Sequence, residues 1–76
     1  MSRFAKLEEF FVEDGRLYFN ELWINPFQIE SFLPLEVSYI NDANEEVDML
    51  ATKIITKSGM EHNIKILPEE LEGKLF

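Results

Sequence analysis

The chain has 76 residues, of which 46% are apolar, and 15 acidic against 7 basic side chains give it a formal net charge of −8. This length supports one small domain, residues 1–76, and the seven Phe residues supply enough apolar material for folding. Because the chain has no cysteine, neither a disulfide framework nor a thiolate metal site can stabilise it. The negative charge repels phosphates and anionic lipid, so we expect no direct nucleic acid binding and no membrane binding.

The N-terminal segment, residues 1–11, lacks the continuous apolar run that is typical of a signal peptide. No window of the sequence approaches the ~20 apolar residues that a membrane-spanning helix needs. On these two grounds we expect the protein to be cytoplasmic.

Two aromatic-rich runs flank Asp14-Gly15 near the N-terminus. Asp-Gly readily adopts the positive φ angles of a type I′ turn, so the pattern predicts a β-hairpin. Residues 16–24 are expected to form the second strand. Residues 4–13 fit either a strand or a short helix, because they include good helix formers, and we favour the strand. Asn25-Pro26 then ends the pairing, since proline brings no N–H group to a ladder.

The second half of the chain shows further strand and turn signals. Apolar and polar residues alternate over residues 33–39, which predicts a half-buried strand, and Pro34 places it at an edge or a bulge. The polar interval 41–48 predicts an exposed loop. The runs on either side of Ser58-Gly59 predict a second hairpin, and a short helix over residues 68–76 should begin at its proline.

The expected fold class is α+β, mostly β: an antiparallel sheet of about five strands, either open or curled into a barrel-like form, with a short C-terminal helix. The strand 16–24 is apolar on both faces, with Tyr18, Leu22 and Ile24 on one side and Leu17, Phe19 and Trp23 on the other. A short helix can cover only part of one face. The surplus apolar surface implies a second layer, formed either by the curled sheet or by another chain.

The order of the segments WINPFQIESF and ATKIITKSGMEHNIKILPEELEGKL resembles the small FlbD-like flagellar and swarming-motility proteins. In that family an Asn-Pro turn and an Ile-Glu pair precede a strand, a Gly hairpin and an acidic terminal helix. Small uncharacterised phage proteins show similar patterns. The resemblance spans Leu22 to Leu75, and the chain departs from it with a longer acidic insert at 41–50 and a more aromatic N-terminus. It implies a small regulatory protein with no catalytic residues to carry over.

His62, the only histidine, is the chain's one candidate for a general base, a metal ligand or a pH switch. Catalysis or zinc binding needs further groups, and the chain has no second histidine and no cysteine. Glu61 points to the opposite face, so any closer acid must come from another strand. We favour a structural histidine near the sheet rim, with its ring packed on Met60 or Ile64. The alternative is a small catalytic or ligand-binding domain that uses His62 with nearby carboxylates.

The segment 42–48 has an acidic or amide side chain at every second position, which superficially matches the ligand spacing of a calcium loop. The match fails because Val47 stands where the sharp turn needs glycine and Lys53 stands where the bidentate glutamate should be. We expect a solvated acidic loop and neither a metal nor a cofactor.

The combination of surplus aromatic residues, strong acidity and no reactive constellation predicts a protein that is not an enzyme. We expect an acidic interaction module that binds and modulates or inhibits another protein, with a basic nucleic-acid-binding surface as the favoured target and nucleic acid mimicry as a sharper variant. We also expect a homodimer or small homo-oligomer. The partner-binding candidates are Phe11, Phe19, Trp23, Asp42, Glu45, Glu46 and Asp48.

Overall fold

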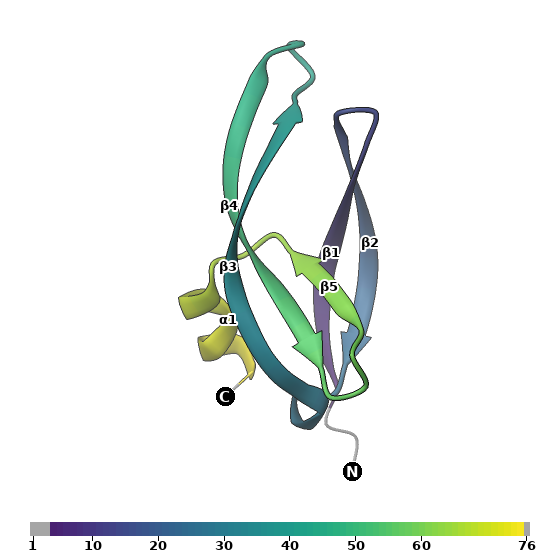
Figure 1. Ribbon diagram of the computed structural model, residues 1–76, viewed down its shortest axis with the longest axis vertical. Coiled ribbons are helices and arrows are strands. Elements are labelled where there is room, and N and C mark those ends of the chain that lie inside the picture. Colours follow the sequence, from purple (N-terminus) through teal and green to yellow (C-terminus); the bar gives the residue numbers. More distant parts are fainter. Residues whose placement is uncertain (1–3, 76) are drawn as a thin grey trace.

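The computed structural model describes residues 4–75, which form one antiparallel sheet of five strands, a 3₁₀ turn and a short C-terminal helix (Figure 1). This confirms the expected α+β, mostly β fold class. The elements in chain order are β1 (Ala5–Glu13), β2 (Arg16–Ile24), η1 (Pro26–Gln28), β3 (Ile29–Ile40), β4 (Glu46–Thr56), β5 (Glu61–Ile64) and α1 (Pro68–Leu75).

The strand order in the sheet is β2-β1-β5-β4-β3, so β2 and β3 are the edge strands. The strands β1 and β2 pair along their whole length, and so do β3 and β4 apart from a bulge near Ile29. The short β5 joins these two long hairpins: it pairs with β4 over its full length but with β1 only at Glu9 and Ile64. The sheet is therefore two hairpins joined at a narrow centre, and it is not a closed barrel.

The turn of the first hairpin confirms the strand interpretation of residues 4–13 over the helix. Asp14 and Gly15 have φ angles of 52° and 79°, as a type I′ turn requires. A Cβ atom on Gly15 would lie only 3.2 Å from the Ile40 side chain. Glycine is thus needed here both for its positive φ and for its close approach to β3.

The two edge strands are tied together at both ends. At one end η1 links β2 to β3, and its Asn25 side chain accepts a hydrogen bond from the Phe27 N–H at 3.0 Å. At the other end the Ile40 N–H donates to the Gly15 carbonyl at 2.6 Å. The two hairpin ends therefore lie together, although no ladder forms between β2 and β3.

The main core lies between the sheet and α1, which packs against β3 and β4 (Figure 1). The Thr52 hydroxyl, fully buried, donates to the Ile66 carbonyl at 2.7 Å and fixes the segment that leads into the helix. Phe10 and Ala51 are also buried, outside this cluster. The buried residues of the main core are Leu7, Ile24, Ile54, Ile64 and Leu71.

The remaining turn and helix predictions hold, with one correction. Gly59 has the positive φ of the second hairpin turn, and α1 begins at Pro68 with acidic residues in its first turn. Pro34 lies on the edge strand β3, as expected. The predicted loop 41–48 is too long, because residues 46–48 belong to β4, where they pair with β3. Cross-strand pairing overrides the polar character of these residues.

Candidate protein-interaction surfaces

The aromatic residues predicted to bind a partner all lie on the first hairpin, but they do not share one face. Phe11 pairs directly with Tyr18, whereas Phe19 and Trp23 occupy positions of the opposite parity on β2. Side chains of a strand alternate between its faces, so Phe11 and Tyr18 lie on one face and Phe19 and Trp23 on the other. The exposed fractions of these four residues lie between 46% and 58%. The structure thus divides the predicted aromatic site into two.

The free side of β2 carries an apolar row, which we name the aromatic edge. In a hairpin with a two-residue turn, Glu13 and Arg16 form the closing hydrogen-bonded pair, so alternate residues from position 17 onward direct their backbone groups away from β1. The side chains of these alternate residues all project from the same face of the sheet, the face on which Phe19 lies. The members of the aromatic edge are Leu17, Phe19, Glu21 and Trp23.

Glu21 is the one acid on the aromatic edge, and its charge is compensated. Its carboxylate lies 3.7 Å from the Lys6 ammonium group and accepts a hydrogen bond from the Trp23 indole N–H at 2.6 Å. Natural edge strands commonly carry uncompensated charges that discourage pairing with another strand. The aromatic edge lacks this protection.

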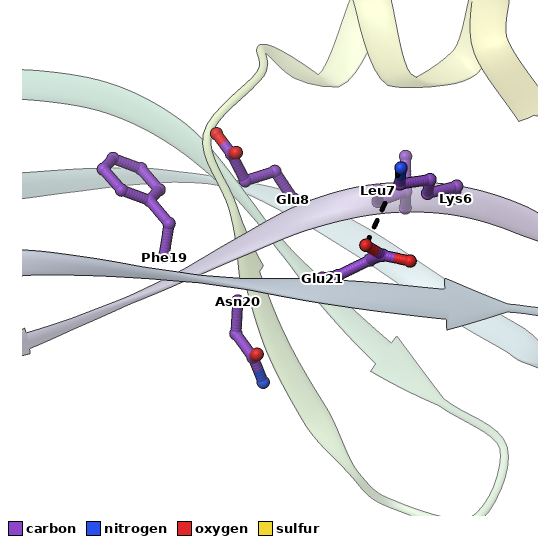
Figure 2. Close-up of a pocket in the computed structure, with 6 residues that line it drawn as sticks. All are labelled: Lys6, Leu7, Glu8, Phe19, Asn20 and Glu21. Atoms are coloured by element: carbon purple, nitrogen blue, oxygen red, sulfur yellow. Dashed lines mark ion pairs between the residues drawn. The ribbon is translucent and has the colours of Figure 1, made fainter.

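A shallow hollow of about 300 Å³ lies beside the aromatic edge (Figure 2). Phe19 stands at one end of it, and the Lys6–Glu21 ion pair stands at the other. The Lys65 ammonium group lies 5.0 Å from the centre of the Phe19 ring, within the range of a cation–π contact. The surface next to the edge therefore combines an aromatic ring with charged groups, as the rim of a protein interface does.

The acidic residues predicted to bind a partner all lie on the β3–β4 hairpin, and the chain from residue 27 to residue 50 contains no Lys or Arg. Asn41 organises the loop of this hairpin, since its side-chain oxygen accepts hydrogen bonds from the Ala43 and Glu45 N–H groups at 3.0 and 2.9 Å. Asp42 and Glu45 lie in the loop, whereas Glu46 and Asp48 lie in β4.

One exposed face of the β3–β4 hairpin carries two of these acids together with a third carboxylate, and we name it the acidic face. Its members are Glu36, Ser38, Glu46, Asp48 and Leu50. Ser38 stands opposite Asp48 and donates a hydrogen bond to its carboxylate at 2.6 Å. Glu36 pairs with Leu50, and Glu46 has the same parity on β4. All five residues are solvent-exposed, and Leu50 is 59% exposed. The acidic face thus has an apolar residue among its carboxylates.

The two hairpin ends bring members of both predicted groups together. The Arg16 guanidinium donates to the Asn41 carbonyl at 3.1 Å and to the Asn44 side chain at 3.3 Å, which connects the first hairpin to the acidic loop. A cleft of about 270 Å³ between the hairpin ends is lined by Phe19 and by Asp42, among others. An aromatic candidate and an acidic candidate therefore border the same cleft.

His62 lies in the central strand β5, so its predicted position near the sheet rim is wrong. The short β5 is held between the two hairpins and not outside them. An acid from another strand does lie beside the ring: it is Glu9 of β1, whose Oε2 atom lies 3.0 Å from the His62 Nδ1 atom. The two side chains are only 14% and 11% exposed. The pair lies where β1 and β5 share a single ladder position, and it reinforces this narrow junction.

The surroundings of the Glu9–His62 pair favour a structural role. Neither side chain lines the hollow beside the aromatic edge, the cleft between the hairpin ends or the hollow next to Gly15 and Ser38. Within the same residues, no group of three or more His, Asp or Glu side chains is placed to hold a metal ion. A buried pair of this kind satisfies the polar atoms of both side chains and connects two strands.

Replacing His62 by glutamine should lower the free energy of unfolding by about 0.5 to 3 kcal/mol and leave partner binding largely intact. Glu9→Gln should have a similar effect. Because the two side chains are in contact, the double variant should cost less than the sum of the single variants. Urea denaturation of the four proteins measures this coupling. A folded His62→Gln protein that had lost all function would overturn the structural interpretation and make His62 the first candidate for an active site.

Sequence reasoning missed four residues that belong to these sites: Tyr18, Glu36, Leu50 and Glu9. A signal for Tyr18 was present, because a two-residue turn at Asp14-Gly15 dictates that Phe11 and Tyr18 stand opposite one another. Glu36 and Leu50 could be placed on the same site only from the register of the β3–β4 hairpin. The loop of that hairpin was predicted too long, and this error concealed the register.

No helix within residues 4–75 is long and apolar enough to cross a membrane. Comparison of the chain with protein-family models, with curated proteins and with solved structures found no match.

Proposed function

We propose that this protein is a non-enzymatic interaction module that binds a basic surface of another protein through the acidic face and thereby modulates or inhibits that protein. The acidic face itself carries the proposal. It concentrates Glu36, Glu46 and Asp48 on one exposed side of a hairpin that has no compensating cation between residues 27 and 50. Such a field speeds the encounter with a positively charged surface and disfavours acidic partners.

The exposed aromatic residues support an interaction role for the first hairpin as well. Trp, Tyr and Phe are enriched in protein interfaces and are frequent hot spots, because a single large side chain excludes much water. Phe11 and Tyr18 form one exposed pair, and the aromatic edge forms another apolar surface. We assign the aromatic edge to self-association into a homodimer and the acidic face to the partner.

A basic surface of this kind is typical of proteins that bind nucleic acid, so such a protein in the cytoplasm is the partner class that we propose. The carboxylates of the acidic face would then occupy positions that phosphates otherwise take. The resemblance to the FlbD-like proteins supports a regulatory role, since it implies a small regulator without catalytic residues.

Affinity capture tests the proposal when it is carried out with two versions of the protein. The wild type should enrich a basic or nucleic-acid-binding protein, and a variant with Glu36, Glu46 and Asp48 changed to their amides should not. Purified candidates then need a direct binding measurement in salt titrations. Capture of partners that bind both versions equally, or of acidic partners only, would reject the acidic face as the binding surface.

Neutralising Asp42, Glu45, Glu46 and Asp48 together should barely change the free energy of unfolding, because exposed charges contribute little to stability. It should slow association with the basic partner and flatten the dependence of the association rate on salt. Stopped-flow measurements over a range of ionic strength test this expectation. Association rates that matched the wild type at every salt concentration would show that these residues do not steer the partner.

A further inference from the structure

The free edge of β3 presents a defined set of backbone groups. The Ile40 N–H donates to Gly15 and so points away from β4, whereas the next residue, Asn41, donates to Glu45 across the hairpin. Backbone groups of an antiparallel strand alternate in direction, so residues 34, 36 and 38 also point away from β4. Pro34 fits this assignment, because a proline is tolerated where its missing N–H would face outward. Between Pro34 and Ser38, the available donors on this edge are therefore the N–H groups of Glu36 and Ser38.

This part of the edge is open to an incoming strand. Within residues 4–75, β3 has a ladder partner on one side only. Pro34, Glu36 and Ser38 are all exposed, and Leu33 beside them is 48% exposed. Only at Ile40 does the first hairpin close the edge, through the hydrogen bond to Gly15.

The two faces of the sheet give an added strand two different environments. The residues that direct backbone groups outward, Glu36 and Ser38, also project their side chains onto the acidic face next to Asp48. The residues between them, Leu35, Val37 and Tyr39, are half-buried on the other face. Side chains directly opposite one another across a ladder interact most strongly. An added strand would therefore place one set of alternate side chains beside the Glu36 carboxylate, with Asp48 one strand further on the same face, and the other set on apolar surface.

We propose that the partner binds by adding an extended segment, antiparallel, to the free edge of β3, and that this segment alternates basic with apolar residues. The proposal rests on the proposed function, which needs only that the acidic face meets a basic surface. A second copy of the chain suits this edge poorly, because two β3 strands would bring like charges of Glu36 and its neighbours together. The basic segment supplies the charge complementarity that a second copy lacks.

A short synthetic peptide of alternating Arg and Val, added to the intact protein, is the probe for this test. In the proposed register the arginines direct both their side chains toward the acidic face and their backbone groups toward β3. N-methylation of the arginine backbone should therefore weaken binding by roughly tenfold or more, because it removes ladder hydrogen bonds. The valine N–H groups face solvent in this register, so their N-methylation should change the affinity little. Both peptides have the same charge and composition, so each serves as the control of the other.

Two protein variants test the side-chain part of the proposal. Glu36→Gln should weaken binding of the unmethylated peptide by about two- to fivefold, the range of one cross-strand pair. Glu72→Gln, an equal charge change on the exposed side of α1, should not. In amide exchange experiments the bound peptide should slow exchange at Glu36 and Ser38. These observations together would support strand addition.

The results of these experiments distinguish a failure of strand addition from a failure of the proposed function on which it rests. If both methylated peptides bind as well as the unmethylated one and Glu36→Gln weakens them all, the acidic face binds basic segments without strand addition, and the inference is overturned alone. If no basic peptide binds and the intact basic partner is not captured either, both proposals fail. If the intact partner binds and the alternating peptide does not, strand addition is rejected.

Discussion

Replacing Ile54 by alanine should lower the free energy of unfolding by about 2 to 5 kcal/mol, the range for truncating a fully buried aliphatic side chain. Ile54 has no exposed surface and lies in the core cluster under α1. A domain of this size has a total stability of roughly 4 to 11 kcal/mol, so the variant should lose a large part of it. Chemical denaturation followed by tryptophan fluorescence or circular dichroism provides the measurement.

Leu50→Ala is the matched control, because Leu50 lies on the same strand and has the same parity as Ile54 but is 59% exposed. Its effect on unfolding should stay within about 0.5 kcal/mol, as is usual for surface substitutions. It should instead weaken binding of the basic partner, since Leu50 lies on the acidic face. Equal destabilisation by the two substitutions would contradict the described burial of β4.

Much of the sheet could be predicted because short sequence motifs specify its turns. Asp14-Gly15 specifies a two-residue turn, and the turn alone fixes the register of β1 against β2. Asn25-Pro26 ends β2 and Pro68 begins α1 through the restricted backbone of proline, and Ser58-Gly59 marks a turn through the positive φ that glycine readily adopts. These signals were sufficient for the fold class and for most strand boundaries.

The missed features depend on contacts between distant parts of the chain. Glu9 and His62 are separated by 53 positions, and nothing near either residue indicates their pairing. The same holds for Arg16, which reaches Asn41 and Asn44 across the two hairpin ends. The short β5 lies in the centre of the sheet because it pairs with β1 as well as with β4, and local propensity carries no information on the pairing with β1.

The alternation of side chains along a strand predicts which face each aromatic residue occupies. It does not predict how deeply each aromatic residue is buried on that face. The parity of β2 shows that Tyr18 and Leu22 share a face, but only Leu22 packs against the core cluster. Tyr18 is 52% exposed because the first hairpin extends beyond the part of the sheet that α1 covers (Figure 1). The length of each hairpin relative to its covering layer therefore decides which aromatic residues are available to partners.

We expect the protein to form a homodimer at micromolar concentration through the aromatic edge. The edge has free backbone groups and a row of side chains with Phe19 at 46% and Trp23 at 58% exposure, and its single acid is compensated by Lys6. Two β2 strands related by a twofold axis would pair along this edge, and their two rows of side chains would then lie side by side and pack against one another. A small domain gains stability from such burial, because its own core is limited.

Trp23→Ala should weaken the dimer by roughly 30-fold or more, the effect of losing a hot-spot side chain, and it should leave the monomer folded, because most of the Trp23 surface is exposed in a single chain. Phe27→Ala is the control, since Phe27 is 62% exposed but lies in η1, outside the edge. Sedimentation equilibrium at several protein and salt concentrations measures both. Because each chain carries a net charge of −8, added salt should strengthen the dimer by screening repulsion between the subunits. A 9.0 kDa monomer at all concentrations would reject self-association and leave the aromatic edge to a different protein.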